Sequence, residues 1–113
     1  MNKEQFEKLI NETLDVTGID ILKTKSRRIE VVDAKVAVVN IMRKFYGTSM
    51  QLTADMLKYT HHTTILHHEK DHSARYRFRP QYADVYDELC KRCVSRNTAI
   101  NVNELVKIMK ELV

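Results

Sequence analysis

Only two glycines and one proline occur in this chain of 113 residues, and this scarcity of turn-forming residues constrains its fold more than any other feature. Hairpins and long loops depend on such residues, so a sheet of short strands is not expected. The apolar residues recur at spacings of three and four rather than in alternation, which is typical of amphipathic helices. The sequence therefore predicts an all-α, multi-helix domain.

The composition indicates one globular domain without a membrane anchor. Apolar residues make up 43% and charged residues 30% of the chain. No apolar run approaches the roughly 20 residues of a membrane span, and the opening MNKEQFEKL lacks the apolar core of a signal peptide. Two cysteines are too few for the disulfide framework of a secreted protein. We expect a cytoplasmic protein, whose net charge of +4 suits a polyanionic partner.

Capping residues and apolar spacing divide the chain into predicted helices. The first helix begins after Asn2 and ends before Gly18, and a mostly buried helix is capped by Asp33. A short helix capped by Ser49 is joined to a second helix by a tight connection, as in a helix-turn-helix. Pro80 opens a further helix. The predicted helices cover residues 3–14, 34–45, 50–57, 60–72, 80–94 and 102–112.

Residues 73–80, SARYRFRP, interrupt this pattern. The alternation of arginines and aromatic residues favours a loop with Tyr76 and Phe78 anchored in the core and the arginines solvated. A phosphate contact by Arg75 or Arg77 is the alternative. We assign residues 1–96 to one domain. Residues 97–113 are expected to form a helix that either packs on this domain or docks a protein partner or a second copy.

A cationic segment, KTKSRR, precedes the buried helix. It carries four positive charges in six residues and no apolar side chain to bury, so we expect an exposed basic loop. Its cations are Lys23, Lys25, Arg27 and Arg28.

The stretch THHTTILHH, residues 60–68, is the most informative motif. At 100° per residue, Ile65, Leu66 and Glu69 share an inner side, while an outer face begins with two threonines. The first turn of a helix offers backbone amides and a positive dipole end to a phosphate. Threonine adds a hydroxyl and a methyl group that suit base edges in the major groove. The outer face comprises Thr63, Thr64, His67, Lys70 and Asp71, flanked by His61, His68 and His72.

The motif HTTILH, preceded by a short helix and a turn, resembles the C-terminal DNA-binding domain of the bacterial replication initiator DnaA. The likeness covers residues 4–70, including the basic loop and the start of the buried helix, and extends more weakly to residue 89. The likeness implies the fold of that domain, which is of the TrpR-like type. It also implies major-groove contacts by His62, Thr63 and Thr64, a minor-groove arginine matched best by Arg28, and a phosphate contact by Lys70. The predicted DNA-binding residues are Lys23, Lys25, Arg27, Arg28, Thr60, His61, His62, Thr63, Thr64, His67 and Lys70.

The chain departs from that family where glycines and an acidic residue usually precede the histidine, since Tyr59, Thr60 and His61 stand there. The recognised DNA sequence is therefore left open. A phosphate-binding loop of the form G-x-x-x-x-G-K-[ST] is missing from the sequence, so we expect no ATPase, no nucleotide and no other cofactor. The expected function is sequence-specific binding of double-stranded DNA by a non-enzymatic, nucleoid-associated regulator of replication or transcription, of bacterial or phage origin.

Two other functions compete with this hypothesis. A Cys2His2 zinc site can be drawn from His68, His72 and the C-x-x-C pair Cys90 and Cys93. The two cysteines, however, share a helical register with Tyr82 and other apolar residues, which predicts core positions rather than a metal site. The other competitor is a protein-binding module that keeps the fold without binding DNA.

Overall fold

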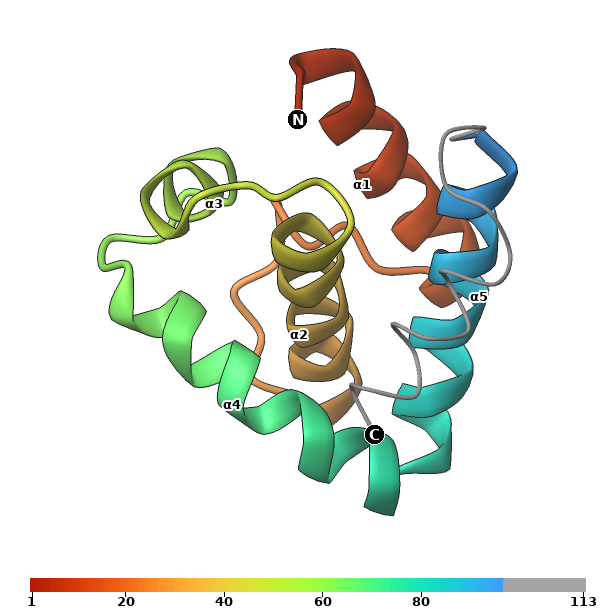
Figure 1. Ribbon diagram of the computed structural model, residues 1–113. Coiled ribbons are helices and arrows are strands. Elements are labelled where there is room, and N and C mark those ends of the chain that lie inside the picture. Colours follow the sequence, from red (N-terminus) through yellow and green to blue (C-terminus); the bar gives the residue numbers. More distant parts are fainter. Residues whose placement is uncertain (97–113) are drawn as a thin grey trace.

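Five helices and no strand make up the part of the chain that the computed structural model describes, residues 1–96 (Figure 1). The prediction of an all-α, multi-helix fold is confirmed. The C-terminal helix predicted at residues 102–112, and any partner contact it makes, lie outside the described residues. The five helices are α1 (Lys3–Thr17), α2 (Ile29–Lys44), α3 (Met50–Met56), α4 (Thr63–Phe78) and α5 (Pro80–Arg96).

Helix α2 passes through the middle of the domain and packs against each of the other four helices (Figure 1). Val36, Val38, Val39, Ile41 and Met42 are fully buried, which confirms the predicted central helix. The four β-branched residues among them, the three valines and Ile41, are poor helix formers, but burial on all sides outweighs a few tenths of a kcal/mol at each position. Helices α1 and α5 pack together on one side of α2, and α3 and α4 pack together on the other.

Three helix ends lie where the capping residues predicted them. The Asn2 side chain accepts a hydrogen bond from the Gln5 amide at 2.8 Å and the Gln5 side chain accepts one from the Asn2 amide, so a capping box opens α1. Gly18 ends α1 with a left-handed φ of +74°. The Ser49 hydroxyl accepts from the Leu52 amide at 3.1 Å and opens α3.

The predicted start of α2 was wrong. The helix begins at Ile29, a full turn earlier, and Arg28 occupies the N-cap position without a side-chain capping bond. Asp33, expected to be the cap, lies inside the helix and is only 3% exposed. Its carboxylate has cationic partners in and just after α4, and these replace the backbone amides of a helix end.

Helix α4 also differs from the prediction. It begins at Thr63 rather than near residue 60, and it continues to Phe78, so the expected loop at residues 73–80 is helical except at Arg79. Helical register turns Tyr76 inward, four residues after the buried His72, and turns Phe78 outward, where its side chain is 74% exposed. The expected core position of Phe78 was therefore wrong.

Candidate nucleic-acid interface

The turn after α3 sets the direction of α4. Helix α3 ends in a Schellman motif, in which the Tyr59 amide donates to the Ala54 carbonyl at 2.9 Å and the Lys58 amide donates to the Asp55 carbonyl at 3.2 Å. Lys58 has a left-handed φ of +61°, at the position where helices usually carry glycine. Tyr59 is half-buried and packs on the core, so the turn is held against the body of the domain.

The residues predicted to read bases lie at this turn and at the start of α4. Thr64 is half-buried, and the Thr64 and Ile65 amides donate to the backbone carbonyls of the two preceding histidines, at 3.3 and 3.0 Å. The amides that we expected to be unpaired are therefore partly used, and side chains are the main groups offered to a ligand. The exposed side chains here are Thr60, His61, His62 and Thr63.

The remainder of α4 has an inner and an outer face. Ile65 is fully buried, and His67 and Lys70 are exposed, as predicted. Leu66 was expected in the core but is 38% exposed, because the buried side of α4 is centred on Ile65 and His72 and leaves Leu66 at its edge. The outer face therefore continues from the first turn along the helix.

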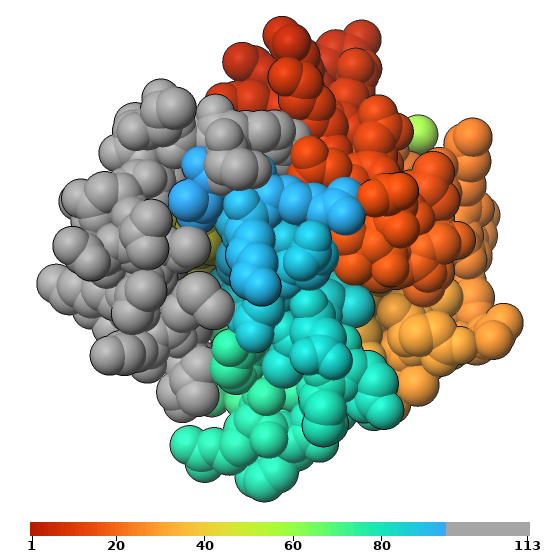
Figure 2. Space-filling view, turned by 90° about the vertical axis from the view of Figure 1, so that its right-hand side faces the viewer, coloured from red at the N-terminus to blue at the C-terminus, as the bar shows by residue number. Residues whose placement is uncertain are grey.

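The basic loop is exposed, as predicted. The side chains of Lys23 and Arg28 are 86% and 77% exposed, and Lys25 and Arg27 are exposed between them. Figure 2 looks onto α1 and α5 and shows the loop, in orange, at the edge of this face. Lys23 lies 3.9 Å from Asp20 and Arg28 lies 3.0 Å from Glu30, so two of the four cations have acidic neighbours. Together the four form an exposed positive surface, defined here as the basic loop surface.

Short side chains order the backbone of this loop. The Thr24 hydroxyl accepts from the Ser26 amide at 3.2 Å, and the Ser26 hydroxyl accepts from the Arg28 amide at 3.2 Å. Such local bonds hold irregular backbone without a ladder of backbone hydrogen bonds. The loop therefore presents its cations on a backbone with defined contacts.

The basic loop and α4 adjoin neighbouring sides of α2. The Lys35 ammonium donates to the Thr24 carbonyl at 3.4 Å, and the same charge contributes to lowering the pKa of His68 on α4. At the end of the loop, Ile29 lines a recess together with Ala74 of α4. The first turns of α2 are thus the connection between the two predicted DNA-contacting elements.

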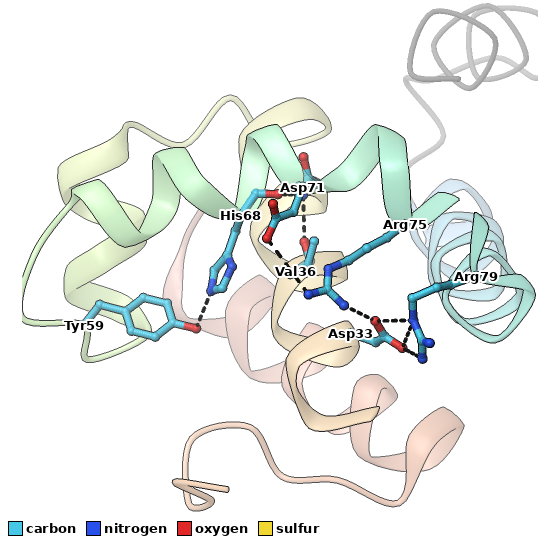
Figure 3. Close-up of polar contacts among 8 residues, drawn as sticks. Asp33, Val36, Tyr59, His68, Asp71, Arg75 and Arg79 are labelled. Atoms are coloured by element: carbon cyan, nitrogen blue, oxygen red, sulfur yellow. Dashed lines mark hydrogen bonds and ion pairs between the residues drawn. The ribbon is translucent and has the colours of Figure 1, made fainter. Parts of the chain in front are cut away.

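A buried carboxylate fastens α4 to α2 (Figure 3). The Asp33 side chain is 5% exposed, and Arg75 Nη1 donates to its Oδ1 at 2.6 Å. Arg79 donates to both carboxylate oxygens, with Nη2 at 2.6 Å from Oδ2, and this hydrogen bonding raises the pKa of the Arg79 guanidinium. We call these three residues the Asp33 clasp. It fixes the second half of α4 against the part of α2 that follows the basic loop.

The clasp was not predicted from the sequence. Its signal was a lone carboxylate in the apolar run VVDAKVAVV, because a charge buried with such a helix requires a cation. Arg75 and Arg79 were expected in solvent, and this expectation was wrong.

Two further polar contacts join α2 and α4. The buried Asn40 side chain donates to the Val36 carbonyl at 2.8 Å and to the His68 carbonyl at 3.1 Å. Arg43 donates to Glu69 at 2.6 Å. Polar contacts therefore hold α4 to α2 at three levels along its length.

His68 links α4 to the turn before it. Its Nε2 lies 3.3 Å from the Tyr59 hydroxyl (Figure 3). Burial lowers the pKa of His68 to about 4, and the charges of Arg75 and Lys35 act in the same direction. The imidazole is consequently neutral near neutral pH. This contact therefore has a structural role, since it holds α4 and its outer face against the turn that precedes the helix.

The four residues of the zinc alternative do not form a metal site within residues 1–96. Cys90 and Cys93 are buried in the core, as expected from their helical register. His72 is buried, with Nδ1 at 2.5 Å from the Tyr82 hydroxyl. No three of the histidine, cysteine and acidic side chains in the described part of the chain are placed to share a metal ion.

The fold and this surface define the class as a small all-α domain with an exposed basic loop and an exposed helix start, both connected to α2. None of the helices described for residues 1–96 has the length and hydrophobicity to cross a membrane. Comparisons with family models, with curated proteins and with solved structures found no match for the chain. The likeness to the DnaA domain consequently stays a prediction from sequence motifs.

Proposed function

We propose that this protein binds double-stranded DNA as a non-enzymatic regulator of replication or transcription. The first turn of α4 enters the major groove, with His62, Thr63 and Thr64 at base edges. The basic loop reaches the adjacent minor groove, with Arg28 as its leading side chain. Lys70 and the other loop cations contact phosphates.

The observation that carries this proposal is that one helix, α2, is connected to both exposed elements, the basic loop and α4. The basic loop runs directly into α2, and α2 holds α4 through the Asp33 clasp and through Asn40. A loop and a recognition helix that enter neighbouring grooves require such a fixed relation. The resemblance of HTTILH and of the basic loop to the DnaA domain supports the same assignment.

Selection of binding sites from randomised duplexes, followed by footprinting of the selected site, tests the proposal. We expect one enriched sequence, with protection in a major groove and in the minor groove beside it. If no sequence is enriched and duplex DNA is not bound, the proposal fails and the protein-binding module takes its place.

Two substitutions test the contacts on the selected site. Thr64→Ala and Arg28→Ala should each weaken specific binding by about 1–3 kcal/mol and relax the preference at the bases concerned. Ser73→Ala, which removes an exposed hydroxyl from α4 outside the predicted contacts, is the matched control and should leave the affinity unchanged. Equal affinities for all four proteins would contradict the assigned contacts.

A further inference from the structure

An apolar surface occupies the other end of α4, away from the first turn of that helix. Phe78 is 74% exposed and Ile29 is 51% exposed, and both line a recess of about 350 Å³ between the start of α2 and the second half of α4. The exposed Ala74 also lines this recess. The end of α4 and the start of α5 form the lower tip of the molecule in Figures 1 and 2. We call the ring and the cavity together the Phe78 surface.

The charges around the Phe78 surface have both signs. The Arg77 guanidinium carbon lies 5.9 Å from the centre of the Phe78 ring, and Arg77 is exposed. Asp71 lines the recess, with a side chain that is 53% exposed and 4.0 Å from Arg75. Arg75 and Arg79 also line the recess, and both are paired with the buried Asp33 carboxylate. A projecting ring with a cation at its side thus stands next to a cavity with an anion at its edge.

We propose that the Phe78 surface binds a second copy of this chain. A two-fold contact requires one surface to complement itself in shape and in charge. Two α4 helices that cross antiparallel near Ala74 would place each Phe78 ring in the recess of the other copy. The same arrangement brings Arg77 of each copy to Asp71 of the other. The patch carries a ring, a recess and charges of both signs, so it is complementary to itself. This favours a second copy of the chain over a partner whose surface carries charge of one sign.

The pairing has a consequence for DNA, which rests on the proposed function. Eleven residues separate Thr63 from Ala74, or about 16 Å of helix at 1.5 Å per residue. Two α4 helices that meet near Ala74 therefore place their first turns about 33 Å apart when the two helix axes are nearly antiparallel. Dimeric helix-turn-helix proteins read half-sites about 34–36 Å apart. The selected DNA sites should accordingly contain two inverted half-sites about one helical turn apart.

Sedimentation velocity of the full chain without DNA tests the association. The expected result is a dimer whose fraction rises with protein concentration and which Phe78→Ser abolishes. Leu66→Ser is the matched control, because it removes an exposed apolar side chain from α4 outside the recess, and it should leave the dimer intact. A chain that stays monomeric at every concentration, or that loses its dimer equally with Leu66→Ser, overturns the proposal and leaves residues 97–113 or another protein as the occupant.

Charge reversal tests the arrangement of the two copies. Arg77→Asp and Asp71→Arg should each raise the dimer dissociation constant by at least about tenfold, because each juxtaposes like charges across the contact. The double variant restores opposite charges and should restore most of the affinity. Failure of this rescue overturns the antiparallel arrangement. Since these measurements contain no DNA, their outcome is independent of whether the protein binds DNA.

Discussion

Lys58 occupies a position at which glycine is the usual residue, because its φ of +61° is left-handed. A side chain in this conformation destabilises the folded state by roughly 1–2 kcal/mol. Glycine removes this strain, but it also makes the unfolded chain more flexible, which offsets part of the gain. We predict that Lys58→Gly raises the free energy of unfolding by about 0.5–1 kcal/mol. Urea denaturation measures this change.

Lys58→Ala separates the backbone effect from loss of the lysine charge. Alanine keeps a Cβ atom in the left-handed conformation, so this variant should show no comparable gain. If alanine stabilises the domain as much as glycine does, the charge and not the backbone limits stability at this turn.

The buried His72 predicts a loss of stability in mild acid. Burial lowers its pKa to about 4, with a further contribution from Lys44, whereas histidine in an unfolded chain titrates near 6.5. As the pH falls from 6.5 toward 4, the unfolded chain binds a proton that the native protein does not. The free energy of unfolding therefore decreases across this window, on the order of 2–3 kcal/mol for this group, and His72 contributes no further change below about 4.

The His72→Gln variant isolates this contribution. Glutamine can hydrogen-bond to the Tyr82 hydroxyl but cannot be protonated in this range. Denaturation curves measured across the window should show a smaller loss for the variant than for the wild type, with His68 supplying part of the remainder. Parallel losses in the two proteins would assign the acid sensitivity to other groups.

At the scale of the helices, the sequence predicted the contacts that are local and missed those that are distant. Asn2, Gly18 and Ser49 act on backbone groups within four residues, so their roles followed from the sequence. Asp33 was misjudged because its partners lie 42 and 46 residues away. A carboxylate before an apolar run resembles a helix cap until these arginines are known to reach it.

The same distinction applies to the candidate site. The exposure of the basic loop and of residues 60–63 followed from polar composition and helical register. The clasp and Asn40 depend on the packing of α4 against α2, and the Lys35 contact depends on the packing of the loop against α2. Local patterns cannot specify such packing, so the residues that present a surface were easier to predict than those that position it.

The clasp should contribute measurably to the packing of α4 on α2. Asp33→Ala removes the buried anion and leaves two arginines without it, so we expect a loss of about 2–4 kcal/mol in the free energy of unfolding. Asp71→Ala is the matched control, because Asp71 is exposed and lies 4.0 Å from Arg75, and it should change stability by less than about 0.5 kcal/mol. Urea denaturation of both variants measures the difference, and equal losses would contradict the structural role of Asp33.

At the scale of the whole molecule, the proposed function depends on where positive charge lies relative to DNA, and salt dependence measures this. Lys25 is an exposed cation of the basic loop, whereas Lys91 is an exposed cation of α5, which lies on the other side of α2 from α3 (Figure 1). Each phosphate contact releases about one counterion, so affinity falls with salt in proportion to the number of contacts.

We predict that Lys25→Ala weakens binding to specific and non-specific duplexes alike and reduces the slope of log affinity against log salt by about 1. Lys91→Ala removes the same charge from α5, outside the predicted DNA contacts, and should leave the slope unchanged. Titrations of both variants at several salt concentrations compare the two slopes. Equal slopes would mean that total charge, and not the basic loop, draws the protein to DNA, and the placement of the loop in the minor groove would then lose its physical basis.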